Sequence, residues 1–184
     1  MRFLPLALGA FSAALFGTQA IAGVTINVSS SAARNCYQSA EARARSQAAI
    51  SQCSAALDSD LLNRDERVAT LVNRGIVLML ADRAPEAIRD FDHALKLDST
   101  EAEAYLNKGL TQYRIGNSAD ALALTSRALE LRTKKPAVAY YVRALASEER
   151  GNVRGAYADL QRAAAIDPSW TEPATQLQRY RVTR

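Results

Sequence analysis

The sequence predicts an all-α protein built as an α-solenoid, which is a stack of antiparallel helix pairs. The first observation is an internal repeat, because Leu71–Gly75 recurs as Tyr105–Gly109 after 34 residues. The second is that small and large residues return together at fixed places in each copy, as closely packed helix pairs require. The third is that Gly, Asn and Ser lie between the expected helices, where caps favour them.

The first 22 residues are predicted to be a signal peptide that is removed from the mature chain. Arg2 supplies a positive start, residues 3–16 are almost entirely apolar, and Ala20-Ile21-Ala22 has the small-x-small form of a cleavage site. Cleavage is expected after Ala22, with Ala20 as the alternative. A membrane anchor is the competing interpretation, but the apolar run is shorter than the ~20 residues that span a bilayer. The mature chain is therefore expected in the periplasm or secreted, with no membrane span.

The residues before the clear repeats divide into two segments. Residues 23–33 are expected to be extended, because three branched apolar residues alternate with polar ones there. Residues 34–67 are predicted to hold a degenerate helix pair and a link, since Ala49–Leu57 aligns with Ala87–Leu95 of the first clear copy. Its first helix is expected at about 34–44, and terminal repeats are often atypical because they cap the stack.

Three clear repeats are predicted at 68–101, 102–135 and 137–170, followed by a C-terminal segment at 171–184. Gly116-Asn117-Ser118 and Gly151-Asn152 mark two of the turns within the repeats, and Pro85 suits a first helical position. The predicted helices of these repeats lie at 66–81, 84–97, 101–115, 118–132, 136–149 and 152–166. A short capping helix is expected at about 172–181.

This arrangement of residues resembles the tetratricopeptide repeat family. That family pairs a large residue with a small one four positions later in the first helix, then places small, aromatic and small residues in the second. The first helices supply Leu71 with Gly75, Tyr105 with Gly109, and Tyr140 with Ala144. The second helices supply Ala87, Phe91 and Ala94, then Ala121, Thr125 and Ala128, then Ala156, Leu160 and Ala163. The family's terminal proline is matched only by Pro168.

The resemblance implies that the first helix of each pair lines a concave groove that binds a partner segment. The implied apolar groove positions are Val72, Ile76, Met79, Leu106, Leu110, Tyr113, Tyr141 and Leu145. Asn73 and Asn107 are expected to hydrogen-bond a ligand backbone, and Arg114 is expected at the rim. An alternative is that these residues pack between helices, or are covered by the N-terminal segment or a second copy. A carboxylate-binding clamp is not expected, because the inner positions are mainly apolar.

Composition and motifs argue against other classes of function. The chain has a formal charge of +4, but its basic residues form small groups and no continuous stripe, which disfavours nucleic-acid binding. There is no glycine-rich phosphate loop and no Gly-x-Ser-x-Gly elbow. His93 is expected to be a solvated surface residue, and Glu148 with Glu149 a solvated helix end. No enzymatic activity and no cofactor are therefore expected.

Cys36 and Cys53 are the two cysteines, and they lie at equal distances from a turn expected near residues 44–45. In an antiparallel helix pair such residues face each other at the same height, so a disulfide is predicted. Export favours it, because disulfides persist in oxidising compartments. The alternatives are two buried free thiols or a reactive thiol. Two cysteines and one distant histidine do not make a metal site.

The predicted function is a protein–protein interaction module or scaffold in the bacterial envelope, with a protein or peptide as its partner. The alternative is a structural or self-associating envelope component, in which the groove or the ends of the stack join copies in a homo-oligomer. An enzyme is the third hypothesis.

Overall fold

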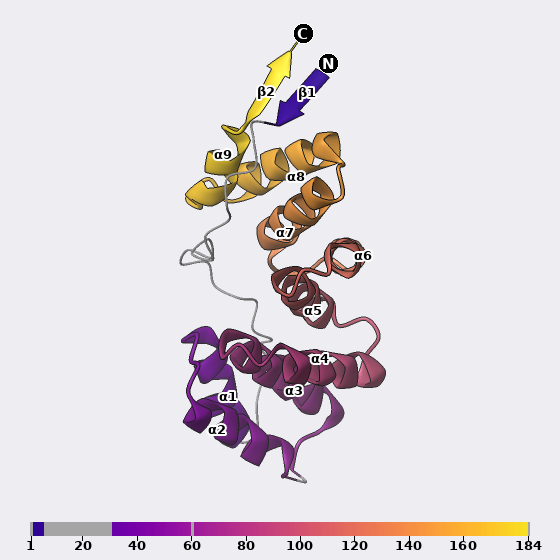
Figure 1. Ribbon diagram of the computed structural model, residues 1–184. Coiled ribbons are helices and arrows are strands. Elements are labelled where there is room, and N and C mark those ends of the chain that lie inside the picture. Colours follow the sequence, from indigo (N-terminus) through magenta and orange to yellow (C-terminus); the bar gives the residue numbers. More distant parts are fainter. Residues whose placement is uncertain (1, 6–30, 60, 184) are drawn as a thin grey trace.

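A computed structural model describes residues 2–5, 31–59 and 61–183 (Figure 1). The helices are α1 (Ser31–Glu41), α2 (Gln47–Leu57), α3 (Arg64–Leu80), α4 (Ala84–Leu97), α5 (Ala102–Arg114), α6 (Ser118–Glu130), α7 (Pro136–Glu149), α8 (Val153–Ile166) and α9 (Thr171–Leu177). Two short strands, β1 (Arg2–Pro5) and β2 (Tyr180–Thr183), complete the described elements. None of the described helices is long and apolar enough to cross a membrane.

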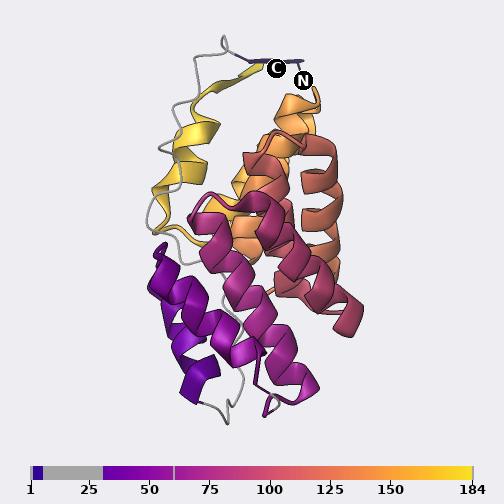
Figure 2. The same cartoon turned by 60° about the horizontal axis from the view of Figure 1, so that its bottom comes forward.

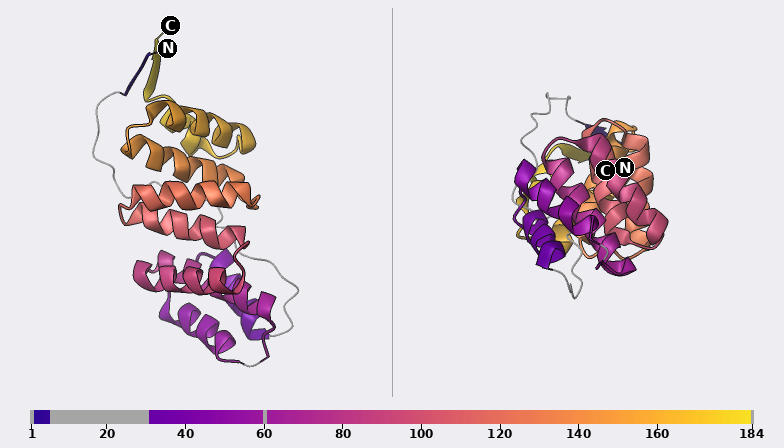
Figure 3. Two further views of the ribbon diagram at one scale, coloured as in Figure 1. Left: turned by 90° about the vertical axis from the view of Figure 1, so that its right-hand side faces the viewer. Right: turned by 90° about the horizontal axis from the view of Figure 1, so that it is seen from below.

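The helices pack in consecutive antiparallel pairs that stack along one axis (Figures 1 and 3). The pairs are α3 with α4, α5 with α6, and α7 with α8, and the first helices α3, α5 and α7 contact one another in turn. Helices α1 and α2 pack on α3 at one end, and α9 packs on α8 at the other. Figure 2 shows α1 and α9 on the same side of this stack. The predicted α-solenoid is confirmed.

Glycine allows the two helices of a pair to approach closely. A Cβ atom on Gly75 would lie 2.5 Å from Cε1 of Phe91, and one on Gly109 would lie 2.9 Å from Cγ2 of Thr125. Real carbon atoms do not come so close, so only glycine fits beside these side chains. Phe91 is fully buried at this crossing. The small residues therefore sit where the first and second helices meet, as the repeat pattern predicts.

Helix ends follow from local capping chemistry. Asn63 and Glu66 form a capping box, in which each side chain accepts a hydrogen bond from the other residue's backbone N–H, and this box starts α3. Gly116 follows α5 with φ +85°, a conformation that glycine adopts without steric cost. Asp82 takes the corresponding place after α3 with φ 59°. Helices α3 to α8 begin and end within two residues of their predicted bounds.

The chain ends differ from the prediction. Helix α1 begins at Ser31, so residues 31–33 are helical and not extended, and residues 23–30 lie outside the described part. The capping helix ends at Leu177, before the predicted 181. Beyond it, β2 pairs antiparallel with β1, with Arg2 opposite Thr183 and Pro5 opposite Tyr180. The signal peptide stays a prediction, because residues 6–22 lie outside the described part.

Candidate functional site

The row of first helices, α3, α5 and α7, is the surface that the sequence indicated as a binding groove. The structure places most of the predicted apolar positions in the core, where they are at most 6% exposed: Val72, Ile76, Met79, Leu106, Leu110, Tyr141 and Leu145. The physical reason is that successive first helices touch, so these side chains pack between pairs. Their apolar surfaces hold the stack together and are not free contacts for a ligand.

The two asparagines predicted to bind a ligand backbone are also buried. Asn107 donates from Nδ2 to the carbonyl oxygen of Glu103 one turn earlier, at 2.8 Å. Asn73 occupies the same register position on α3 and is 2% exposed. Both amides therefore lie within the packed interior of the solenoid.

Arg114, which the sequence indicated as a rim residue, links two repeats. Its Nη1 donates to the backbone oxygen of Met79 at 2.9 Å, and its Nη2 donates to Oδ1 of Asp82 at 2.7 Å. These acceptors stand at the end of α3 and in the turn after it. Arg114 thus adds a hydrogen bond to a carbonyl at the end of α3, which also accepts one from the backbone N–H of Asp82 at 3.2 Å.

The polar and aromatic part of the row lies where the ends of α5 and α7 meet the chain after α9. Glu149 is exposed there, Tyr113, Glu148 and Arg179 are half-buried, and Tyr141 and Tyr180 are buried. We call this region the groove end, and it comprises Tyr113, Tyr141, Glu148, Glu149, Arg179 and Tyr180. Arg179 donates from Nη2 to Oε1 of Glu148 at 3.0 Å and from Nη1 to Oε1 of Gln176 at 2.5 Å. Glu149 accepts a hydrogen bond from Ser118 on α6. Glu148 is thus an ion-pair partner, not the solvated residue that the sequence suggested.

Burial and acidic neighbours raise the pKa of all three tyrosines of the groove end. Burial raises the pKa of Tyr141 to about 12, with a further contribution from the negative charge of Glu172. Burial likewise raises the pKa of Tyr113, and the charge and hydrogen bond of Glu149 raise it further. For Tyr180 burial comes first, followed by the charge of Glu148. All three phenols therefore stay protonated near neutral pH and can act as hydrogen-bond donors.

A polar hollow opens beside the groove end, between the turns of the second and third repeats. Its volume is about 540 Å³, and it is lined by Gly116, Asn117, Ser118, Ala119, Asp120, Glu149 and Arg150. Glu149 belongs to both regions, so the hollow continues the groove end toward the turn side of the stack. The sequence indicated the turn residues only as caps.

The sequence did not predict the ion pairs that join the helices, either within one helix pair or between two neighbouring pairs. Arg74 pairs with Asp90, Arg143 pairs with Asp159, and Lys108 pairs with Asp92, each at 2.6 or 2.7 Å. The available signal was a basic residue directly before the small residue of each first helix.

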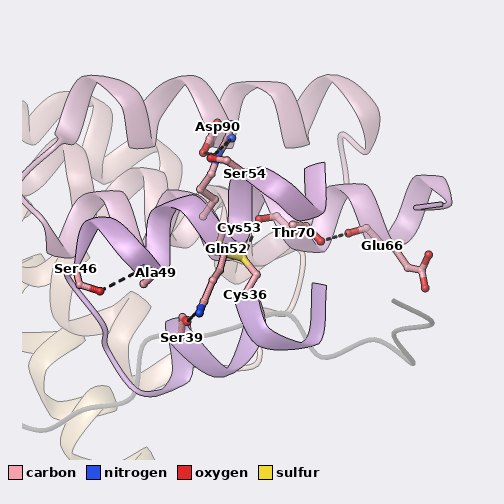
Figure 4. The surroundings of a disulfide bond; sticks show 11 residues. Cys36, Ser39, Ser46, Ala49, Gln52, Cys53, Ser54, Glu66, Thr70 and Asp90 are labelled. Carbon is pink, nitrogen blue, oxygen red and sulfur yellow. Dashed lines mark hydrogen bonds and ion pairs between the residues drawn. A yellow bond between two sulfur atoms is a disulfide. The ribbon is translucent and has the colours of Figure 1, made fainter. Parts of the chain in front are cut away.

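A disulfide joins Cys36 on α1 to Cys53 on α2 (Figure 4). The two Cα atoms are 4.6 Å apart, and both cysteines are fully buried. Sγ of Cys36 lies 3.8 Å from the carbonyl oxygen of Thr70 on α3. The bond therefore ties α1 to α2 and lies against α3, the first helix of the first clear repeat.

The described residues contain no group of three or more His, Cys, Asp or Glu side chains placed to hold a metal ion. His93 is exposed on α4, on the outer helix of its pair. It lies in a different helix from every member of the groove end.

Several solved structures have a fold similar to that of this chain. No protein-family model matches the chain, and no curated protein matches it by sequence. The structure of MamA superposes with a TM-score of 0.60 at 26% identity, covering 70% of this chain and 72% of that one. The first TPR of Spaghetti (RPAP3), bound to the HSP90 peptide SRMEEVD, gives a TM-score of 0.58 at 18% identity, covering 65% and 94%. YrrB, a TPR protein with an unusual peptide-binding site, gives a TM-score of 0.58 at 21% identity, covering 71% of this chain and 64% of that one.

Proposed function

Because this chain is a tetratricopeptide-repeat solenoid, we propose that it is a protein–protein interaction module that binds a partner segment along its row of first helices. The observation that carries the proposal is the stacking of α3, α5 and α7 in one register, with an accessible polar and aromatic region at its end. Such a row offers a long, preformed surface, and repeat arrays use surfaces of this kind for binding.

Two of the similar structures support this proposal through what they bind. One was solved with an HSP90 peptide, and another is described as having a peptide-binding site. Both share the fold of this chain at low sequence identity, so they support the class of ligand and not its sequence. The buried apolar positions indicate that contacts come from the groove end and the rim, where Tyr113, Arg114 and Glu149 are accessible.

Site-specific crosslinking tests the proposal in intact cells. A photoreactive amino acid at position 113 should capture a discrete partner, because Tyr113 is half-buried in the row of first helices. The matched control places the same group at position 93, which is exposed on the outer helix α4. Tyr113→Glu should reduce capture through a group at position 149 while circular dichroism stays helical. The same products from positions 113 and 93, or none from either, would contradict groove binding.

We also propose that the protein is exported to the cell envelope. The leader-like residues 1–22 support this, and so does the buried disulfide, which suits an oxidising compartment. Fractionation with intact-mass measurement tests it. The expected product is an envelope or secreted chain beginning at Gly23, and a cytoplasmic chain that retains residues 1–22 would refute export.

A further inference from the structure

The groove end combines carboxylates, phenols and a guanidinium in one small region. Glu148 and Glu149 close α7, and the charge of Glu172 on α9 acts on Tyr141. Arg179 lies on Glu148, and Arg150 lines the adjoining hollow. This region therefore carries three carboxylates and two guanidiniums, an acidic balance in a chain whose total charge is +4.

Three buried side-chain polar groups in this region have no hydrogen-bond partner among the described residues: the hydroxyls of Tyr141 and Tyr180, and Nε1 of Trp170. The rings of Tyr141 and Trp170 lie 4.8 Å apart at 57°. The two residues are at most 5% exposed. Buried polar groups are normally paired, so an unpaired donor and an unpaired hydroxyl side by side indicate a ligand that supplies their partners.

The chain itself shows which chemistry fits the region. Arg179 follows α9, and its guanidinium donates to both carboxylate oxygens of Glu148, at 3.0 and 3.4 Å, and to the amide oxygen of Gln176. Its positive charge also acts on the phenols of Tyr141 and Tyr180. A planar guanidinium thus already lies on a carboxylate beside aromatic rings, which is the setting that arginine favours.

We propose that the groove end binds an arginine side chain of the partner segment, which displaces Arg179 from Glu148. This inference rests on the proposed function and specifies one residue that the partner must bring. The incoming guanidinium donates to Glu148 and to the hydroxyl oxygen of Tyr141, and Nε1 of Trp170 donates to a backbone carbonyl of the same segment. Arg179 is then an internal competitor that pairs with Glu148 when the partner is absent.

A titration with a small probe tests the proposal without knowledge of the partner. Trp170 is the only tryptophan, so its indole N–H gives a single NMR signal. Nα-acetyl-arginine methylamide should shift that signal at millimolar concentration. The matched control is Nα-acetyl-citrulline methylamide, which has nearly the same shape but no charge and should leave it in place.

Three variants distinguish arginine binding from a purely structural role of the ion pair between Arg179 and Glu148. Arg179→Gln should tighten binding of the arginine probe about threefold or more, because it removes the competitor. Glu148→Gln should weaken binding about tenfold. Tyr141→Phe should weaken it as well, although the buried hydroxyl has no internal partner to lose and the fold should persist.

The outcomes that overturn the proposal are specific. If the ion pair only fastens α9, Arg179→Gln and Glu148→Gln will act in the same direction. An equal shift with the citrulline probe, or no shift in wild type and Arg179→Gln, also rejects arginine binding. Continued crosslinking at position 113 under those results would leave the interaction module intact, so the two proposals fail separately.

Discussion

Arg74 on α3 holds Asp90 on α4 through two hydrogen bonds, from Nε to Oδ2 at 2.7 Å and from Nη2 to Oδ1 at 2.8 Å. Arg143 and Asp159 repeat this bidentate arrangement in the third repeat, at 2.7 and 2.9 Å. The second repeat has Leu124 where aspartate would stand, and Lys108 instead reaches back to Asp92 on α4 at 2.6 Å. The ion pairs therefore either tie the two helices of one pair together or tie one pair to the next.

Asp90→Ala should destabilise the protein by about 2 kcal/mol, because it leaves the partly buried guanidinium of Arg74 without its carboxylate. The matched control is Asp92→Ala, whose side chain is 44% exposed against 9% for Asp90. We expect the control to cost about 1 kcal/mol or less, as exposed pairs do. Urea unfolding followed by circular dichroism measures the free energy of unfolding of both variants. Equal decreases would show that burial does not determine how much these ion pairs stabilise the fold.

Gly75→Ala should destabilise the protein by about 2 kcal/mol, since the new methyl group overlaps the ring of Phe91. The gain in helix propensity from Gly to Ala offsets at most about 1 kcal/mol. The double variant Gly75→Ala with Phe91→Leu should recover part of the loss, because the third repeat already combines Ala144 with Leu160. A double variant less stable than both single ones would contradict this packing argument.

The sequence predicted the solenoid well because each repeat carries the same local and packing signals. Gly75 and Gly109 lie at helix crossings, and the glycines after α5 and α7 adopt the positive φ that their turns require. The candidate site was predicted less well, because a position facing inward on a first helix does not reveal whether its neighbour covers it. Leu106 and Leu110 are buried by packing between pairs, which a single repeat cannot show.

The sequence indicated Tyr113 and Tyr141 of the groove end as groove positions, but it did not predict the rest of this region, for a different reason. Arg179 and Glu148 are separated by 31 residues and come from different parts of the repeat pattern. Only the fold brings the chain after α9 back to the end of α7. The surroundings of Tyr141 likewise include Trp170, whose ring packs on it from outside the helices of the third repeat.

Removal of the disulfide with Cys36→Ala and Cys53→Ala together should destabilise the protein by roughly 3 kcal/mol in the chain-entropy model, since the bond closes a loop with a sequence separation of 17. Because the bond joins α1 to α2 at the end of the stack, these two helices should lose amide protection before α3 does. Hydrogen exchange with mass spectrometry measures this order. The unreduced wild-type chain should also weigh two hydrogens less than the reduced one, and two freely alkylated thiols would refute the bond.

Glu103 should make stability fall as pH rises through the mildly acidic range. Its carboxylate is buried and accepts hydrogen bonds from the Thr133 hydroxyl at 3.0 Å and from the backbone N–H of Lys134 at 2.6 Å. Burial, which outweighs those bonds, raises the pKa of Glu103 above 4.5, and the charge of Glu101 adds to the rise. A folded-state pKa above the unfolded value means that the stabilising contribution is complete below the unfolded pKa. That contribution is lost as pH increases through the folded pKa.

The stability of wild type relative to Glu103→Gln should therefore decrease as pH is raised from below 4.5 toward neutrality. The matched control is Glu86, because its hydrogen bond from Arg83 lowers the pKa of that carboxyl. Wild type relative to Glu86→Gln should show the opposite slope, with the contribution of Glu86 lost as pH falls through its folded pKa. Urea unfolding at a series of pH values gives both differences. Slopes of the same sign for the two variants would mean that burial does not govern the ionisation of Glu103.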